Sequence, residues 1–184
     1  MELVTGHGGQ SHVSADDVAS MRKALFTAGE YVLEKGSKFA YEISSNNLIV
    51  LSGGEAIVQG RHCRTKADER EECTIENGTQ GQKRHDLICI KYKQVNGVET
   101  AEVVVVKGAP GVTGADPSIT TGDIEAGATE HHMPLYRVIL NGLNISSVVP
   151  VYKVYHRIPN FASGTADPDP ANYEEGDVYF KFID

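Results

Sequence analysis

Short runs of alternating hydrophobic and polar residues cover most of the chain, which is the pattern of half-buried β-strands. The runs are rich in β-branched and aromatic residues, and Gly, Asn-Gly or Pro separates one from the next. In the first third of the chain they predict strands at residues 31–33, 39–43, 48–51 and 56–59. The pattern therefore favours a mainly β protein.

One segment near the N-terminus has helical spacing instead. Ser14 and Asp17 have the Ser-x-x-Asp form of a helix-capping signal, and Gly29 is placed to end the helix. The apolar residues between them recur on one helical face: Val18, Met21, Leu25 and Phe26. We expect one helix of about 13 residues that is apolar on this face.

Two hairpins are predicted in the middle of the chain. Ile88, Ile90 and Tyr92 share one face of a strand at residues 86–94, and residues 103–107 form an apolar partner strand. Asn96-Gly97 lies between them, and both residue types tolerate the positive φ that a tight hairpin turn requires.

Residues 135–140 and 145–155 repeat this plan around Asn141-Gly142. Between the two hairpins, residues 108–132 predict a long loop that covers a sheet edge or reaches a neighbouring subunit. The fold class we expect is an antiparallel β-sandwich-like domain with one short N-terminal α-helix and an extra C-terminal strand.

The composition changes at Pro159, where a loop rich in Pro, Asp and Ala precedes an alternating strand. One face of that strand holds Val178, Phe180 and Phe182, and the other holds Tyr179, Lys181 and Ile183. A single strand cannot form a core, so we expect it to join the main sheet or pair with another chain. The sequence thus divides into a domain at residues 1–158 and a short appendage at residues 159–184.

Charge and cysteine content exclude several classes of protein. The net charge of −8 repels a phosphate backbone, so nucleic acid is not an expected partner. The first residues lack the features of a signal peptide, and no apolar run approaches the roughly 20 residues that span a bilayer, so we expect a soluble protein without membrane insertion. Cys63, Cys73 and Cys89 fit no disulfide framework or CxxC metal site and are expected to be reduced thiols, with Cys89 in a strand core.

The segment before the strand at residues 86–94 invites a test for phosphate binding. Gly78, Gly81, Lys83 and Arg84 do not have P-loop spacing, and a strand rather than a helix follows them. We therefore expect a turn. Adjacent strand residues point to opposite faces, so His85 and Asp86 are not a catalytic pair, and Asp86 is expected to cap the turn or pair with Arg84.

Metal and catalytic patterns are also weak. His131-His132 with Glu130, His62-Cys63, and His7 with His12 lack the spacings that bring ligands to one face, so surface or loop histidine is the default and a composite site of distant histidines stays open. Asp116, Asp123 and Glu125 match no calcium motif. The paired carboxylates Glu71-Glu72 and Glu174-Glu175 are expected to be solvated loop charges. The sequence therefore predicts no catalytic residue, metal ligand or cofactor.

Several segments in series resemble tail or baseplate proteins of long-tailed phages and of prophages of Gram-positive bacteria. They are "MELVTGHGGQSHVSADD", "GEYVLEKGSKFAYEISSNNLIVLSGGEAIVQGRHCR", "TIENGTQGQKRHDLICIKY" and "TGDIEAGATEHHMPLYRVILNGLNI", which cover most of residues 1–155. The final segment, "GTADPDPANYEEGDVYFKFID", resembles a strand unit of phage fibres that often follows an anchoring domain.

This resemblance implies a non-enzymatic structural protein in the attachment part of a tail appendage. It implies a homo-oligomer, with a trimer favoured, that docks to other tail or baseplate proteins in the virion after synthesis in the bacterial cytoplasm. Gly78 and Gly81 would allow a turn. Lys83, Arg84 and Asp86 would make polar contacts at the base of a strand or across a subunit boundary.

Two alternatives stay open. A carbohydrate-binding module that contacts host-surface glycan would need exposed aromatic residues, and Tyr136, Tyr152, Tyr155 and Tyr173 are the candidates, although the chain has no Trp. An envelope-degrading hydrolase would need clustered carboxylates or a metal, for which the sequence has no useful spacing.

Overall fold

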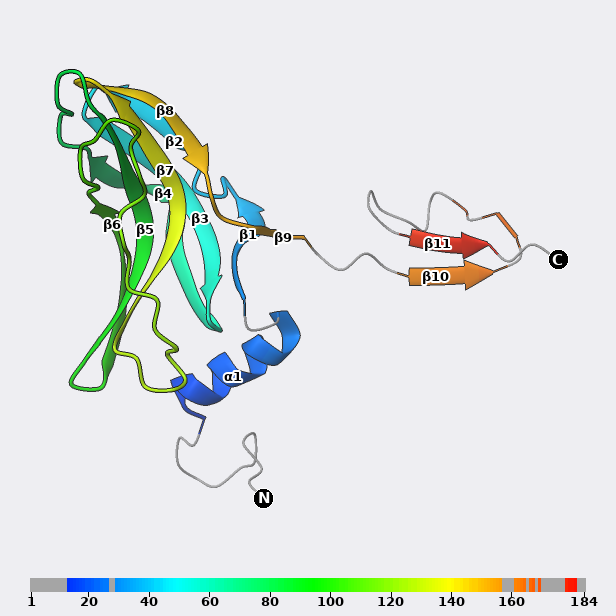
Figure 1. Cartoon of the computed structure of the whole chain (residues 1–184). Coiled ribbons are helices and arrows are strands. Elements are labelled where there is room, and N and C mark those ends of the chain that lie inside the picture. Colours follow the sequence, from blue (N-terminus) through cyan, green and yellow to red (C-terminus); the bar gives the residue numbers. More distant parts are fainter. Residues whose placement is uncertain are drawn as a thin grey trace.

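The computed structural model describes residues 13–26, 29–156, 161–164, 166, 167, 169 and 178–181. This part of the chain forms one helix and eleven strands (Figure 1). They are α1 (Ala15–Phe26), β1 (Glu30–Gly36), β2 (Tyr41–Ser45), β3 (Leu48–Val58), β4 (Arg61–Thr74), β5 (Lys83–Val95), β6 (Val98–Val106), β7 (Glu130–Asn141), β8 (Asn144–Pro150), β9 (Val154–Tyr155), β10 (Phe161–Gly164) and β11 (Val178–Lys181). No helix in the described part is long and apolar enough to cross a membrane.

Two curled sheets form the body of the protein. In the first, β3 pairs with β4 along one side, and with β1 and β2 at successive positions along the other, while β9 pairs with β1. The second has the order β6-β5-β7-β8. Figure 1 shows the two sheets curving around a shared interior, so the expected mainly β, sandwich-like fold is confirmed.

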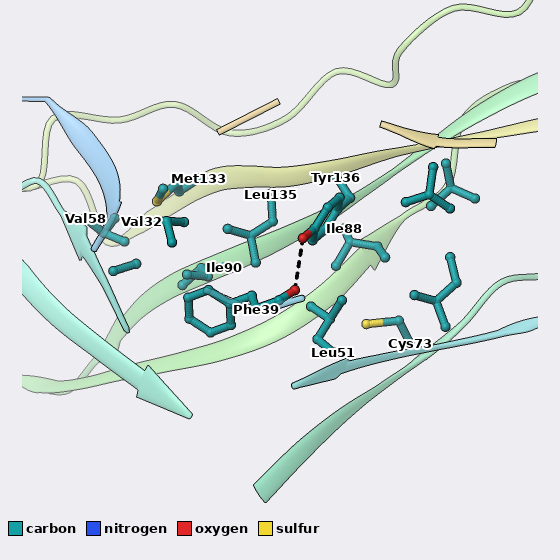
Figure 2. Packing of buried hydrophobic residues seen from close by; sticks show 14 of the residues in the cluster. Val32, Phe39, Leu51, Val58, Cys73, Ile88, Ile90, Met133, Leu135 and Tyr136 are labelled. Atoms are coloured by element: carbon teal, nitrogen blue, oxygen red, sulfur yellow. Dashed lines mark hydrogen bonds between the residues drawn. The ribbon is translucent and has the colours of Figure 1, made fainter. Parts of the chain in front are cut away.

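The core lies between the inner faces of these sheets. Ile88, Ile90 and Tyr92 are all buried in it, as their shared face predicted. Phe39 and Leu135 are also buried, and the hydroxyl of Tyr136 donates to the Phe39 carbonyl at 3.0 Å (Figure 2). Alternation along β5 and β7 therefore places large apolar side chains on one face of the second sheet.

The two predicted hairpins form with different turns. Asn96 and Gly97 have φ of 51° and 79°, and Val95 pairs with Val98, which confirms a two-residue turn at Asn96-Gly97. Asn141 instead pairs with Asn144, so the second turn is Gly142-Leu143. In this turn only Gly142 has a positive φ, of 62°, as in hairpin turns whose first residue is glycine. Asn141 is the last residue of β7.

The sequence prediction of the first sheet was wrong in two respects. Residues 48–51 and 56–58 belong to one strand, β3, whose pairing is irregular between Ser52 and Gly54, and Gln59 lies in the turn that follows. The 14-residue β4 was missed because its sequence is largely charged. It lies at the edge of its sheet, where most of its side chains stay exposed, so Glu71-Glu72 is part of a strand and not of a loop.

Residues 145–155 form two strands in different sheets, not one. β8 ends at Pro150, which has no N–H for a ladder, and the chain then crosses to β1. The Val151 N–H donates to the Leu135 carbonyl, and the Val32 N–H donates to the Lys153 carbonyl of the crossing segment, each at 2.9 Å. Because β9 runs parallel to β1, the expectation of a purely antiparallel protein is corrected.

Helix α1 begins where the sequence predicted. The Ser14 hydroxyl donates to the Asp17 carboxylate at 2.7 Å and accepts the Asp17 N–H at 3.1 Å. The apolar face is only partly covered, because Val18 and Phe26 are half-buried whereas Met21 and Leu25 are 57% and 63% exposed. The one fully buried residue of the helix is Ala19. A Cβ on Gly60 would lie 2.3 Å from the Ala19 carbonyl oxygen, so the helix rests on the β3–β4 turn through its small residue.

The C-terminal strand pairs in a way that the sequence did not predict. β10 and β11 form a separate two-stranded parallel sheet, in which Tyr179 is opposite Ala162 and Phe180 is opposite Ser163. β11 therefore neither joins a main sheet nor needs another chain for its ladder, because residues 161–164 supply a partner. Phe182 and the predicted boundary at Pro159 lie outside the described residues.

Candidate functional site

The two glycines before β5 form a turn that packs on the β7–β8 hairpin. A Cβ on Gly78 would lie 2.0 Å from the Gly142 carbonyl oxygen, so only glycine fits there. The Gly78 N–H donates to the Leu143 carbonyl at 3.2 Å, and the Gly142 N–H donates to the Gln82 carbonyl at 2.8 Å. With φ of 74° at Gly81, the turn predicted at Gly78 and Gly81 is confirmed.

Arg84 and Asp86 form a buried ion pair, which we call the polar node. Arg84 Nε and Nη2 each lie 2.8 Å from one carboxylate oxygen of Asp86, and the two side chains are 2% and 1% exposed. Arg84 also donates to the carbonyls of Glu76 and Asn77, and Asp86 accepts the Gly108 N–H at 2.9 Å. The pairing predicted for Asp86 is confirmed, and it joins three segments of one chain at the base of β5.

The neighbours of the polar node fasten the loop that follows β6. Lys83 and Gly111 exchange two backbone hydrogen bonds of 2.8 Å, while the Lys83 side chain is exposed. On the same side of β5, His85 Nδ1 lies 3.0 Å from Asp116, and Arg137 Nε donates to Asp116 at 2.6 Å. The Arg137 guanidinium, with a contribution from His85, lowers the pKa of Asp116.

This loop covers a sheet edge, as predicted, but it ends before residue 130. Its Thr120 carbonyl accepts the His132 N–H at 2.8 Å, and Thr121 bridges to His131, so the loop lies against the outer side of β7. His131 and His132 belong to β7 and are 4% and 7% exposed. The prediction of surface or loop histidine was therefore wrong, because the loop folds back over the start of β7.

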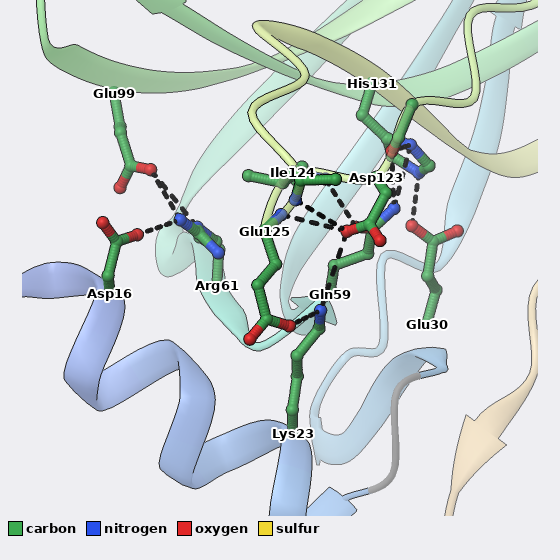
Figure 3. A network of polar contacts seen from close by, with 12 residues as sticks. Asp16, Lys23, Glu30, Gln59, Arg61, Glu99, Asp123, Ile124, Glu125 and His131 are labelled. Carbon is green, nitrogen blue, oxygen red and sulfur yellow. Dashed lines mark hydrogen bonds and ion pairs between the residues drawn. The ribbon is translucent and has the colours of Figure 1, made fainter.

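His131 lies in a network that holds the far end of the same loop (Figure 3). Gln59 Nε2 donates to the Gly122 carbonyl at 2.9 Å, and Gln59 Oε1 accepts the Ile124 N–H at 3.0 Å. His131 Nδ1 donates to the same Gly122 carbonyl at 2.9 Å, and Nε2 makes an ion pair with Glu30 that is not aligned as a hydrogen bond. Burial opposes the charged form of His131, but Glu30 and Gly122 outweigh it and raise its pKa.

Because of this raised pKa, the stability of the protein should depend on pH through His131. The folded state holds the imidazole proton more tightly than the unfolded state, so the contribution is complete below the ordinary pKa of 6.5 and is lost as the pH rises through the folded value. We expect the free energy of unfolding to fall with pH across that window. Urea titrations at several pH values measure it.

The matched control is His131→Gln, which keeps a polar side chain but cannot titrate. The difference between wild type and this variant should shrink as the pH rises above 6.5. A difference that stays constant, or grows, over that range would show that His131 is not protonated in the folded protein.

Arg61 anchors α1 to the end of the sandwich (Figure 3). Its Nη2 lies 2.5 Å from Asp16 on the helix and 3.0 Å from Glu99 on β6, and its guanidinium carbon lies 5.8 Å from the centre of the Tyr92 ring. The Tyr92 hydroxyl donates to Glu99 at 2.7 Å. Burial and the Glu99 carboxylate raise the pKa of Tyr92 to about 12, so the hydroxyl stays a donor.

Replacing Arg61 by alanine should loosen α1 without unfolding the sheets. The contact with Asp16 is the one that reaches the helix, and Glu99 and Tyr92 hold the Arg61 side chain in place for it, so we expect a loss of about 1 kcal/mol. Amide hydrogen exchange across α1 should then become about five- to tenfold faster, while the core strands β5 and β7 keep their rates. Arg61→Lys retains the charge but not the planar guanidinium group. Its exchange rate across α1 should lie between those of the wild type and Arg61→Ala.

A groove of about 380 Å³ separates α1 from β4 and β6. Its lining includes Ala15, Val18 and Arg22 of the helix, Cys63 of β4, and Thr100 and Ala101 of β6. Glu99 of β6 also lines the groove, so α1 and β4 lie beside the outer side of β6 at residues 99–101.

The acidic residues considered for calcium are divided between two places. Asp116 binds Arg137, whereas Glu125 and Asp123 face Lys23 of α1, at 2.6 and 3.9 Å. In the described part of the chain, no three His, Cys, Asp or Glu side chains gather closely enough to hold a metal ion. The histidine of the His62-Cys63 pair lies 2.7 Å from Glu55.

The three cysteines are unpaired thiols, and Cys89 is fully buried in its strand as expected. Burial, with a contribution from the carboxylate of Glu30, raises the pKa of Cys63 to about 11. Burial also raises the pKa of Cys73 and of Cys89 to about 12. These thiols are therefore protonated and poorly nucleophilic at neutral pH.

Three of the tyrosines considered for sugar stacking pack against other rings of the protein. Tyr136 is 2% exposed, and its ring lies 5.5 Å from that of Tyr152 in an edge-on arrangement. Tyr155 packs in the same manner on Phe26 and Tyr31, at 4.9 and 5.7 Å. Tyr173 lies outside the described residues. The sequence could not distinguish exposed from packed rings, because both occur at strand spacing.

Sequence reasoning missed Gln59 and Arg61, which hold the loop and the helix. The signal was Gln59-Gly60, whose φ values of 45° and 85° make it a two-residue hairpin turn like Asn96-Gly97. Recognising that turn would have paired β3 with β4 and placed both side chains at one end of the sandwich. No protein-family model matches this chain, and no curated protein sequence matches it.

Proposed function

We propose that this chain is a non-enzymatic structural component of a phage or prophage tail or baseplate, which assembles with itself and docks to other tail proteins. The observation that carries the proposal is the polar node. Arg84 and Asp86 lie in one of the segments that resemble the tail proteins, and their polar atoms bond to each other and to this chain's own backbone. Side chains that are fully engaged in holding their own backbone are expected in a rigid structural protein.

The exposed apolar side chains also support the proposal. Part of an assembled particle must offer surfaces that neighbouring subunits cover, and large apolar residues on such surfaces mark them. The side chains concerned are Met21, Leu25, Tyr41, Ile43, Val95, Val98, Val112, Leu143 and Val149, which are 39% to 90% exposed. They lie on the helix, on edge strands and on turns.

The partners proposed are further copies of the chain and other tail or baseplate proteins, in the virion tail. Three-fold symmetry is the expectation that the resemblance carries. Host-surface glycan is a less favoured partner, because the packed Tyr136 does not supply a stacking platform.

The test is the solution mass of the purified chain by light scattering over a wide concentration series, followed by pull-down with the other tail proteins encoded beside it. We expect a stable multiple of 19.9 kDa and capture of at least one tail protein. A chain that stays monomeric at high concentration and captures none of them would contradict the proposal.

A further inference from the structure

The chain contains three Asn-Gly pairs, Asn77-Gly78, Asn96-Gly97 and Asn141-Gly142, each at a connection between two strands. In such a pair the asparagine side chain can lose ammonia when the glycine backbone nitrogen attacks its Cγ. Glycine favours this reaction because it has no side chain to hinder the approach. The surroundings of each glycine nitrogen therefore decide which of the three pairs can react in the folded protein.

Two of the three glycine nitrogens are held by hydrogen bonds between neighbouring connections. The Gly78 N–H donates to the Leu143 carbonyl at 3.2 Å, and the Gly142 N–H donates to the Gln82 carbonyl at 2.8 Å. To reach the preceding Cγ, either nitrogen would have to break its bond and separate the β4–β5 connection from the β7–β8 turn.

The asparagines of these two pairs are also held through their backbone. The Asn77 carbonyl accepts a hydrogen bond from Arg84 at 3.1 Å. Asn141 is the last residue of β7, where it pairs with Asn144 on one side and with Lys83 on the other. Rotation of the backbone at either asparagine would therefore disturb further contacts.

The nitrogen of Gly97 has no comparable restraint. In the part of the chain that the structure describes, the Gly97 N–H has no hydrogen-bond partner, and nothing lies within 4 Å of the position that a Cβ would occupy. Asn96 and Gly97 are exposed, and the flanking Val95 and Val98 are 51% and 63% exposed. Pairing of Val95 with Val98 closes the turn at the end of the hairpin, where local opening costs least.

We propose that Asn96 is a site of spontaneous deamidation in the folded protein, with water as the co-reactant. The Gly97 nitrogen gives its proton to a solvent base and attacks the Asn96 Cγ. A bond forms between this nitrogen and Cγ, the bond from Cγ to the side-chain nitrogen breaks, and that nitrogen leaves as ammonia with a proton from solvent. The product is a succinimide ring.

Water then opens the ring at either of its two carbonyl carbons. Addition at Cγ gives aspartate at residue 96. Addition at the backbone carbonyl carbon gives isoaspartate, in which the main chain runs through the former side chain. Either product replaces a neutral amide by a carboxylate, so each reaction adds one negative charge to the turn.

Isoaspartate also changes the shape of the hairpin end. It lengthens the main chain by one carbon atom, so the two-residue turn that sets Val95 opposite Val98 can no longer form unchanged. The Gln94 N–H donates to the Thr129 carbonyl at 2.8 Å and holds β5 directly before the turn. The change should therefore be confined to the end of the hairpin.

The test is incubation of the full wild-type chain in mildly alkaline buffer, followed by tryptic peptide mapping with mass spectrometry. Trypsin cuts after Lys and Arg, so the three Asn-Gly pairs fall on separate peptides, at residues 71–83, 94–107 and 138–153. Each peptide reports deamidation by its mass, and labelling with an isoaspartyl methyltransferase identifies isoaspartate.

We expect Asn96 to deamidate about tenfold or more faster than Asn77 and Asn141, because each hydrogen bond that must first break slows the reaction several-fold. The matched control is the same chain unfolded in urea, in which the three pairs should react at similar rates. Asn96→Gln is a second control, because the longer side chain forms a ring far more slowly, and its peptide at residues 94–107 should stay unmodified.

Two outcomes would overturn the inference. One is deamidation in the folded chain that is as fast at Asn77 or Asn141 as at Asn96. The other is an Asn96 that stays intact in the folded chain while the urea-unfolded chain reacts. The inference does not rest on the proposed function, because it uses only the surroundings of three connections within one chain.

Discussion

Replacing Asp86 by alanine should lower the free energy of unfolding by about 3–5 kcal/mol, the typical cost of removing one member of a buried ion pair. Arg84 would then hold an uncompensated charge at 2% exposure, and the Gly108 N–H would lose its acceptor. Urea unfolding at pH 7 measures the change. Because the polar node joins three segments, we expect the wild type to unfold in one cooperative transition.

The matched control removes both charges together. Arg84→Met with Asp86→Leu fills similar volumes without an unpaired charge, so it should cost clearly less than Asp86→Ala alone. It still leaves the carbonyls of Glu76 and Asn77 without the Arg84 donor, so some loss is expected. If the double variant lost as much free energy of unfolding as Arg84→Ala and Asp86→Ala lose together, the two charges would not act as a pair.

Replacing Phe39 by alanine should cost about 3–5 kcal/mol, as for other buried aromatic side chains. The ring is 1% exposed and lies between the two sheets with Leu51 and Ile90 (Figure 2). Phe39 also has a φ of 57°, which is unfavourable for a side chain of this size, so packing must outweigh backbone strain. Alanine would keep the strain and lose the packing.

The control for this prediction is Gly54 on β3, which packs against Phe39. A Cβ on Gly54 would lie 2.6 Å from the Phe39 backbone nitrogen and 2.7 Å from its ring, so Gly54→Ala should also destabilise the protein. In the Phe39→Ala background the ring contact is gone, and the additional cost of Gly54→Ala should be smaller. Additive costs in guanidinium unfolding would argue against contact between these two positions.

Some local elements of this protein follow from the sequence because their causes lie within a few residues. The capping pair Ser14 and Asp17, the turn at Asn96-Gly97 and the buried face of β5 each depend on local spacing. The pairing of Arg84 with Asp86 was also predictable, because residues two apart on a strand share a face. For these features, the spacing of the residues in the sequence is sufficient to predict the structure.

Other features were missed because distant segments decide them. β4 is nearly all polar, and it is a strand only because β3 supplies its ladder. The buried face of α1 depends on the β3–β4 turn beneath it, which selects Ala19 over Met21. The parallel pair of β10 and β11 likewise needed a partner strand that the sequence pattern did not identify.

A mainly β chain with one short helix follows from the amino-acid sequence, since alternation and helical spacing are local properties of the amino acids. The burial of His131 against Glu30 and the packing of Tyr136 inside the protein depend instead on contacts between distant segments. Burial and pairing depend on which segments meet, and a hydrogen bond or an ion pair gains its strength from the surroundings that those segments create.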